Sequence, residues 1–187
     1  MFIEPASGEE ADSLYDLERE RVGSVPNFVR AFSHRPEVYV AWRGLVGAIQ
    51  GASDPRRFEL ATLAAAKRLR SSYCSLAHGK MLVDRFYSAD QVLRLPGGLD
   101  ETDAAIMSFA EKVAGDASLV TQEDVQQLRE VGLSDAEITD VVLAAALRSF
   151  FAKTLDGLGA LPDAVYAGLD PALRDELTVG RPIDGAV

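Results

Sequence analysis

The amino-acid sequence predicts an all-α fold. Two observations support this class: apolar residues recur with a helical period along nearly the whole chain, and helix start signals return at intervals. No stretch shows the apolar–polar alternation that is typical of a half-buried strand. No repeat of fixed period is visible, which argues against a solenoid. The 187 residues are 48% hydrophobic and 26% charged, as is usual for a globular domain with its own core.

The first helix is expected near the N-terminus. Ser7 followed by Glu10 has the pattern of a capping box, and the polar, acidic segment after it predicts a helix to about Arg21. Two prolines then interrupt the chain before an apolar helical segment at Val38–Ile49. This second segment is apolar enough to need a partner surface.

The central part of the chain holds the clearest start signal. Asp54, followed at once by proline, fits an N-cap and first helical position, and the alanine-rich segment after it predicts a helix to about Arg70. Ser71 and Ser72 can cap a further helix that continues through Met81. We therefore expect two consecutive helices joined by a short turn.

The second half of the chain repeats the same signals. Ser88 with Gln91 predicts a short helix, which a Leu-Pro-Gly-Gly sequence closes. Three later helices are expected to begin after the N-cap residues Asp100, Thr121 and Ser134. The last of them, about Asp135 to Leu158, is strongly apolar and is expected to be a buried central helix.

We expect the whole chain, residues 1–187, to form one domain, with an N-terminal helix or arm at 1–21 and a C-terminal tail at 163–187. The net charge of −10 argues against nucleic acid as a partner, because phosphate affinity depends on clustered Lys and Arg. The longest apolar run, Val141–Leu147, is far shorter than the ~20 residues that span a bilayer, so no membrane partner is expected. The acidic N-terminus lacks a signal-peptide pattern and favours a cytoplasmic location.

The single cysteine excludes an internal disulfide framework and a multi-thiolate zinc site, and we expect neither a metal nor a cofactor.

Cys74 and His78 are four residues apart and share one face of the expected helix. An ordinary thiol, with a pKa of about 8.5, is mostly protonated at neutral pH, and a nearby base, a helix N-terminus or positive charge raises its thiolate fraction. Residues 54–85 carry seven bases against three acids. The alternative is that Cys74 only fills space in the core.

The spacing of four residues resembles a known signature. The sequence resembles the E-x11-C-x-x-C-x3-H motif of the alkylhydroperoxidase D-like family, which belongs to the superfamily of the carboxymuconolactone decarboxylases. The residues at the four motif positions are Glu59, Ser71, Cys74 and His78. Ser71 stands where the first motif cysteine belongs. The segments GSVPNFVRAFSHRPEVYVAW and VTQEDVQQLREVGLSDAEI resemble the uncharacterised peroxidase-related branch, and the likeness covers about residues 23–162.

This resemblance implies a small all-helical fold that forms homo-oligomers and reduces hydroperoxides with a thiol. It implies that Cys74 attacks the peroxide, that His78 is its base and hydrogen-bond partner, and that Glu59 orients His78. Ser71 cannot form the disulfide that complete members use. The expected partners are therefore a small hydroperoxide as substrate and an external thiol or a reductant protein.

Three functions remain open at this point. The first is an antioxidant peroxidase with one catalytic cysteine, which becomes a sulfenic acid and is recycled by the external thiol. The second is a helical oligomer that keeps the fold and binds partners without turnover. The third is a lactone decarboxylase in which Glu59 and His78 act as general acid and base.

Overall fold

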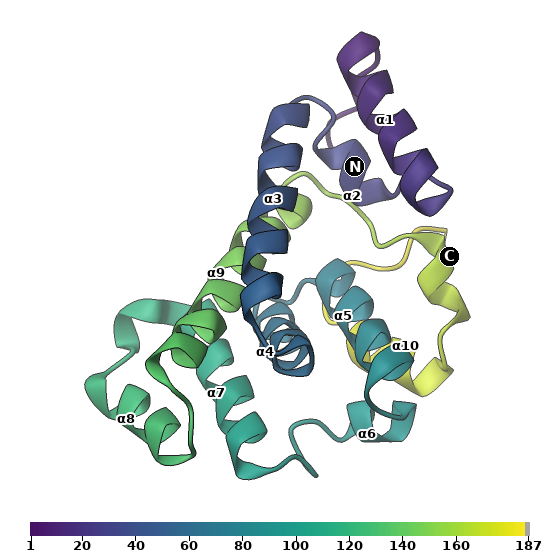
Figure 1. Ribbon diagram of the computed structural model, residues 1–187. Helices are drawn as coiled ribbons and strands as arrows, with labels where there is room; N and C mark the ends of the chain where they lie inside the picture. The colour runs from purple at the N-terminus through teal and green to yellow at the C-terminus, as the bar shows by residue number, and fades with distance from the viewer. Residues whose placement is uncertain (186–187) are drawn as a thin grey trace.

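The computed structural model describes residues 1–185, and within this range the chain is helical with no strand (Figure 1). The elements, with two short 3₁₀ helices labelled η, are α1 (Glu9–Val22), α2 (Asn27–Ala31), α3 (Pro36–Ala52), α4 (Pro55–Arg68), α5 (Ser72–Arg85), α6 (Ala89–Leu93), α7 (Glu101–Asp116), η1 (Ala117–Leu119), α8 (Gln122–Glu130), α9 (Asp135–Gly157), η2 (Ala164–Gly168) and α10 (Pro171–Leu177). The all-α prediction is confirmed for the described residues.

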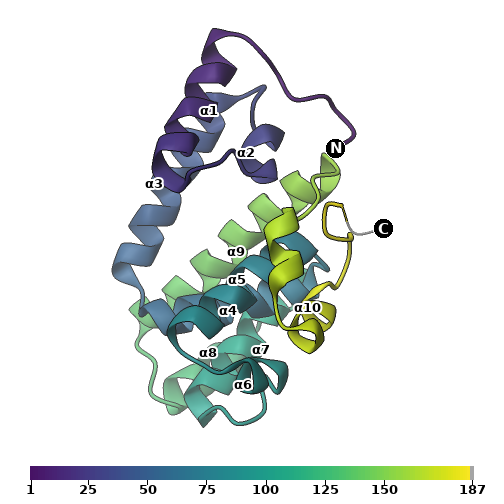
Figure 2. The same ribbon diagram turned by 90° about the vertical axis from the view of Figure 1, so that its right-hand side faces the viewer.

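Helix α4 lies at the centre and packs against α5, α7 and α9. Helices α1 and α2 gather around the start of α3 at one end of the molecule, and α8 lies at the opposite end (Figures 1 and 2). Helix α10 covers α5 and α6 on the side that faces the viewer in Figure 2. The candidate site residues on α4 and α5 are therefore in the interior.

The burial of α4 follows from its sequence. All nine residues from Phe58 to Ala66 are buried, because small alanines on every side let three neighbouring helices approach closely. The expectation that the last helix is the buried central one needs correction. On α9, Val142, Leu143 and Phe150 are 36%, 41% and 46% exposed, so this helix has a solvent face along its length, whereas the segment of α4 from Phe58 to Ala66 has none.

Most of the expected helix starts are confirmed. Five of the expected N-cap side chains accept a backbone hydrogen bond in the first turn, those of Asp54, Ser88, Asp100, Thr121 and Ser134. The capping box at Ser7 is wrong, since α1 begins after Gly8 and has no side-chain cap. Helix α4 ends at Arg68, two residues earlier than expected, because the chain turns there through Arg70 in a left-handed conformation with φ of 56°.

The segment expected as a tail contains structure. It holds η2 and α10, and α10 packs so closely on α5 that a side chain at Gly79 would collide with Leu177. Beyond α10, the backbone N–H of Gly180 donates to Ser72 Oγ at 2.8 Å, at the start of α5. Residues 186 and 187 of that expected tail lie outside the described residues. No helix of the described chain is long and apolar enough to cross a membrane.

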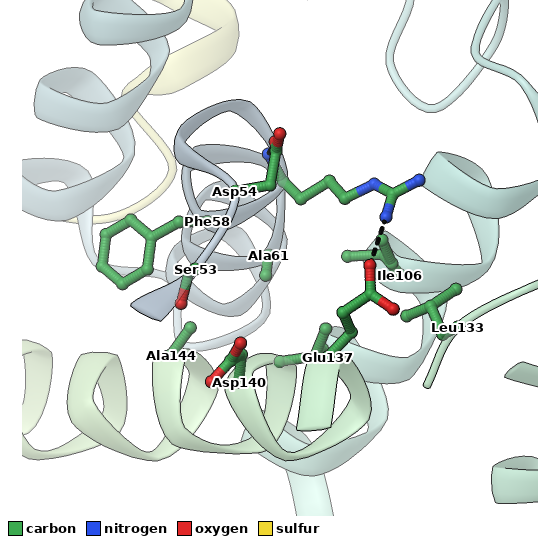
Figure 3. A pocket seen from close by; sticks show the side chains of 11 residues that line it. Ser53, Asp54, Phe58, Ala61, Ile106, Leu133, Glu137, Asp140 and Ala144 are labelled. Atoms are coloured by element: carbon green, nitrogen blue, oxygen red, sulfur yellow. Dashed lines mark hydrogen bonds and ion pairs between the residues drawn. The ribbon is translucent and has the colours of Figure 1, made fainter. Parts of the chain in front are cut away.

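A polar cluster joins α4 to α7 and α9. The fully buried carboxylate of Asp103 on α7 pairs with Arg56 and Arg57 of α4. Arg57 Nη1 also lies 3.0 Å from Glu137 Oε1 of α9, and the dashed line to Glu137 in Figure 3 marks this contact. Arg57 and Glu137, together with Phe58, line a cavity of about 30 Å³. The cluster holds the first turn of the central helix between its neighbours.

We expect Asp103→Asn to lower the free energy of unfolding by about 2 kcal/mol, because it leaves two partly buried guanidinium groups without their shared counter-ion. Urea unfolding measures the change. The matched control is Asp16→Asn, which removes an exposed pair with Arg19 and should cost less than about 1 kcal/mol. Equal losses in the two variants would contradict a structural role for Asp103.

Candidate functional site

The packing of α5 on α4 brings two candidate residues together. Glu59 lies in the buried middle of α4 and is 4% exposed, and its Oε2 is 2.5 Å from Nδ1 of His78 on α5. A buried carboxylate needs a hydrogen-bond donor, so Nδ1 is protonated and donates a hydrogen bond to Oε2 of Glu59. The tautomer that results leaves Nε2 of His78 unprotonated and able to accept a proton.

Cys74 is the third residue of α5, whose N-cap is Ser71. In the first turn of a helix, unpaired backbone N–H groups favour a negative charge. The cysteine is 1% exposed, and the side-chain donor to its Sγ is Nη1 of Arg148 on α9, at 3.4 Å. The expected hydrogen bond between Cys74 and His78 is not formed within the described residues: Nδ1 of His78 bonds the carboxylate on α4, and the sulfur bonds the cation on α9.

Arg148 is a site residue that the sequence did not reveal. It is 5% exposed and lies 74 positions beyond Cys74, in the middle of the strongly apolar α9. The one available signal was a lone arginine inside a long apolar run, and charged residues are rarely buried without a purpose. Only the packing of α9 on α4 and α5 places the guanidinium at the sulfur.

Burial lowers the pKa of His78 below its ordinary value of 6.5, and the positive charge of Arg148 lowers it further. The hydrogen bond and negative charge of Glu59 act in the opposite direction and do not fully compensate. His78 is therefore a neutral imidazole at pH 7. A neutral ring held through Nδ1 is a proton acceptor at Nε2.

Aromatic and polar groups from distant segments cover the start of α5. The hydroxyl of Tyr73 donates a hydrogen bond to Asp163 and accepts one from the backbone N–H of Phe28 at 3.2 Å. Burial raises the pKa of Tyr166 to about 12, with smaller contributions from Asp163 and from Cys74. The thiol thus lies in an environment that excludes bulk water.

Ser71, the residue in the position of the first motif cysteine, is fully buried at the N-cap of α5, three residues before Cys74. Its side chain makes no capping hydrogen bond. All four predicted residues, Glu59, Ser71, Cys74 and His78, therefore lie on the paired helices α4 and α5 or at their junction, and the structure adds Arg148.

The described part of the chain contains no group of three or more His, Cys, Asp or Glu side chains arranged to hold a metal ion. What the arrangement offers is a sulfur beside a fixed cation, and a neutral histidine whose free nitrogen can take up a proton. These are the parts of a nucleophilic thiol site.

No protein-family model and no curated protein sequence matches the chain. Among solved structures, it is similar to an alkylhydroperoxidase AhpD core protein described as peroxidase-related, from Ralstonia eutropha, with 23% identity, 88% of this chain and 94% of that chain covered, and a TM-score of 0.73. It is also similar to an uncharacterised peroxidase-related protein from Silicibacter, with 20% identity, coverage of 86% and 88%, and a TM-score of 0.73.

A third similar structure is a cysteine-to-alanine variant of the debrominase Bmp8 in complex with 2,3,4-tribromopyrrole, with 14% identity, coverage of 95% and 97%, and a TM-score of 0.74. At these identities the comparisons establish the fold, and they agree with the expected alkylhydroperoxidase D-like architecture. Proteins of this fold carry different activities, so the reaction has to be argued from the site.

The lowered pKa of His78 makes stability depend on pH. The unfolded chain takes up a proton at this residue near pH 6.5, whereas the folded chain does so only at lower pH. The contribution of neutral His78 is therefore complete above about pH 6.5 and is lost as the pH falls through the folded-state pKa. We expect His78→Asn, which keeps a donor to Glu59, to lose less stability than the wild type between about pH 7.5 and pH 5.

Urea unfolding at the two pH values measures this difference. His34→Asn is the matched control, since it removes the other histidine of the chain, which lies on the surface. If His78→Asn and the wild type lose the same stability, His78 is not held neutral in the folded protein.

Proposed function

We propose that this chain, which has the fold of the alkylhydroperoxidase AhpD core, is a thiol-dependent hydroperoxide reductase that uses Cys74 as its only redox-active cysteine. One observation carries the proposal: Cys74 lies in the buried first turn of α5, one turn before His78, and Nδ1 of that histidine is held by the buried carboxylate of Glu59. A nucleophile, a base and a group that orients the base are the components of an activated thiol.

In the proposed reaction, Nε2 of His78 accepts the thiol proton, directly or through one water, and Glu59 stabilises the imidazolium that forms. The sulfur attacks the terminal peroxide oxygen, an S–O bond forms, and the O–O bond breaks. The leaving alkoxide takes the proton back from His78. The balance is Cys–SH + ROOH → Cys–SOH + ROH, in which sulfur is oxidised and the peroxide is reduced.

The return step requires a reductant from outside the chain, because Ser71 has no sulfur with which to form a disulfide. Two external thiols complete the cycle: Cys–SOH + 2 R′SH → Cys–SH + R′SSR′ + H₂O. Cys74 is 1% exposed, so a substrate that reaches its sulfur has little room around it. We infer that the substrate is a small hydroperoxide.

We expect the wild type to consume hydrogen peroxide when an external dithiol is supplied, and Cys74→Ser to lose at least about a hundredfold in rate because the nucleophile is gone. Glu59→Gln should lose about tenfold to a hundredfold, since it removes the negative charge beside the base. Peroxide consumption is measured at neutral pH, with mass spectrometry of the peptide that contains Cys74. Equal consumption by wild type and Cys74→Ser would exclude the proposal.

The variant Ser71→Cys tests the missing resolving step. Residues 71 and 74 lie within one turn at the start of α5, so peroxide should produce a disulfide between them, and dithiol-driven turnover should rise. The wild type should instead give a sulfenic acid or a mixed disulfide with the added thiol. A Ser71→Cys protein that forms no such disulfide would show that the two side chains do not meet.

Reductive dehalogenation is the second candidate, and the similarity to the debrominase over 95% of this chain favours it. With an external thiol as the reductant, the balance is Ar–Br + 2 RSH → Ar–H + RSSR + HBr. Bromide release from a bromopyrrole, measured beside peroxide consumption on the same protein, separates the two activities. The contact between Glu59 and His78 alone would also suit lactone decarboxylation, but that reaction gives no role to Cys74.

We also propose that the chain forms homo-oligomers through the outer faces of α3 and α9. A groove of about 470 Å³ between these helices is lined by apolar side chains, of which Leu45, Leu143 and Phe150 are 52%, 41% and 46% exposed. A contiguous apolar surface of this kind is typical of a protein interface, and a second copy of the chain is the occupant that the resemblance implies.

Sedimentation at micromolar concentration should give a mass above the 20.1 kDa of one chain. Leu45→Asp should shift the protein toward the monomer, because it places a charge in the apolar contact. The matched control is Leu119→Asp, on η1, which changes an apolar side chain that is 61% exposed and lies away from this face. A wild-type monomer would rule the interface out.

A further inference from the structure

Arg148 is a buried cation without a carboxylate partner among residues 1–185. Its side chain is 5% exposed, and its Nε makes no hydrogen bond there. An arginine keeps its proton in proteins, so the charge cannot be removed by titration. A buried guanidinium that no negative charge compensates is strongly unfavourable, and some group nearby has to supply that charge.

The contacts of the guanidinium identify one nearby group. Nη1 lies 3.4 Å from Sγ of Cys74, and the carbon of the guanidinium lies 5.4 Å from the ring centroid of Phe151. The aromatic face offers a weak attraction to a cation. Of these two contacts, only the sulfur can carry a full negative charge.

We propose that Arg148 is a catalytic residue that holds Cys74 as a thiolate in the resting protein, an inference that rests on the proposed thiol chemistry and assigns its charge partner. Glu59 is not the direct partner of Arg148, because its carboxylate bonds Nδ1 of His78. The resting site therefore contains two buried pairs, Arg148 with the thiolate and Glu59 with a neutral imidazole.

This arrangement changes the origin of the proton in the reaction. The thiol proton has already left through Nε2 of His78 to solvent before the peroxide binds. The thiolate then attacks, the O–O bond breaks, and the alkoxide takes a proton from water by way of the histidine: Cys–S⁻ + ROOH + H⁺ → Cys–SOH + ROH. Arg148 donates no proton, and loses its anionic partner when the neutral sulfenic acid forms.

The ultraviolet absorbance of the thiolate tests the proposal without requiring a reagent to reach the buried sulfur. Because the chain has one cysteine, subtracting the spectrum of Cys74→Ser at each pH isolates the signal of Cys74. The wild type unfolded in urea gives the reference for an unperturbed thiol. The variants are Arg148→Met, which removes the charge at similar length, and Arg148→Lys, which keeps it. The matched control is Lys153→Met, which removes an exposed charge from the same helix.

We expect the folded wild type to show most of the thiolate signal at neutral pH, where the unfolded chain shows little. Arg148→Met should lose at least tenfold in thiolate fraction at neutral pH and a similar factor in the rate of peroxide consumption, and both should recover as the pH is raised. Arg148→Lys should retain much of the signal, and Lys153→Met should match the wild type.

A folded wild-type thiol that ionises at the same pH as in urea would overturn the proposal, and would mean that Glu59 balances Arg148 through His78. This comparison decides the matter even if Arg148→Met does not fold. Matching curves for Arg148→Met and the wild type would also overturn it. The protein could also show a thiolate that depends on Arg148 and yet consume no peroxide. That result would support the charge pair and exclude the proposed peroxidase function, so the failure of one proposal is distinguishable from the failure of the other.

Discussion

A buried carboxylate on the central helix is the constraint on which the site depends. Helix α4 is enclosed by α5, α7 and α9, and Glu59 lies in the middle of its buried segment. A carboxylate in that position requires a donor, and the 2.5 Å contact with His78 supplies it. The same contact fixes the ring orientation and the tautomer, so the requirement of the buried carboxylate for a donor leaves Nε2 as the unprotonated ring nitrogen.

The two charged residues of the site act on His78 in opposite directions. Glu59 favours the imidazolium, while burial and Arg148 disfavour it. The combined effect of burial and Arg148 is the larger, so the pKa of His78 is lowered. The site therefore keeps its histidine neutral and its cation permanent. The two residues can therefore act differently on the sulfur. In a low-dielectric environment the arginine can stabilise a negative sulfur without exchanging protons, and the histidine can exchange protons without remaining charged.

Segments outside helices α4, α5, α7 and α9 cover the start of α5, the helix that carries Cys74. Tyr73, Phe28 and Asp163 form hydrogen bonds that join the first turn of α2 to the start of α5 and to the chain after α9. Related folds carry peroxidase-related and debrominase proteins, so the fold alone does not choose the chemistry. The choice of chemistry therefore has to come from the groups around Cys74.

The sequence alone determined the features that depend on neighbours within one or two turns: the all-α class, the caps at Asp54 and Ser134, and the spacing of Cys74 and His78 on one helix. Local hydrogen bonds and the helical period decide such features. Only the tertiary structure decided that α4 is the enclosed helix, that Glu59 reaches His78, and that Arg148 lies against the sulfur. Those contacts depend on how helices pack across long stretches of chain, and no local pattern encodes that geometry.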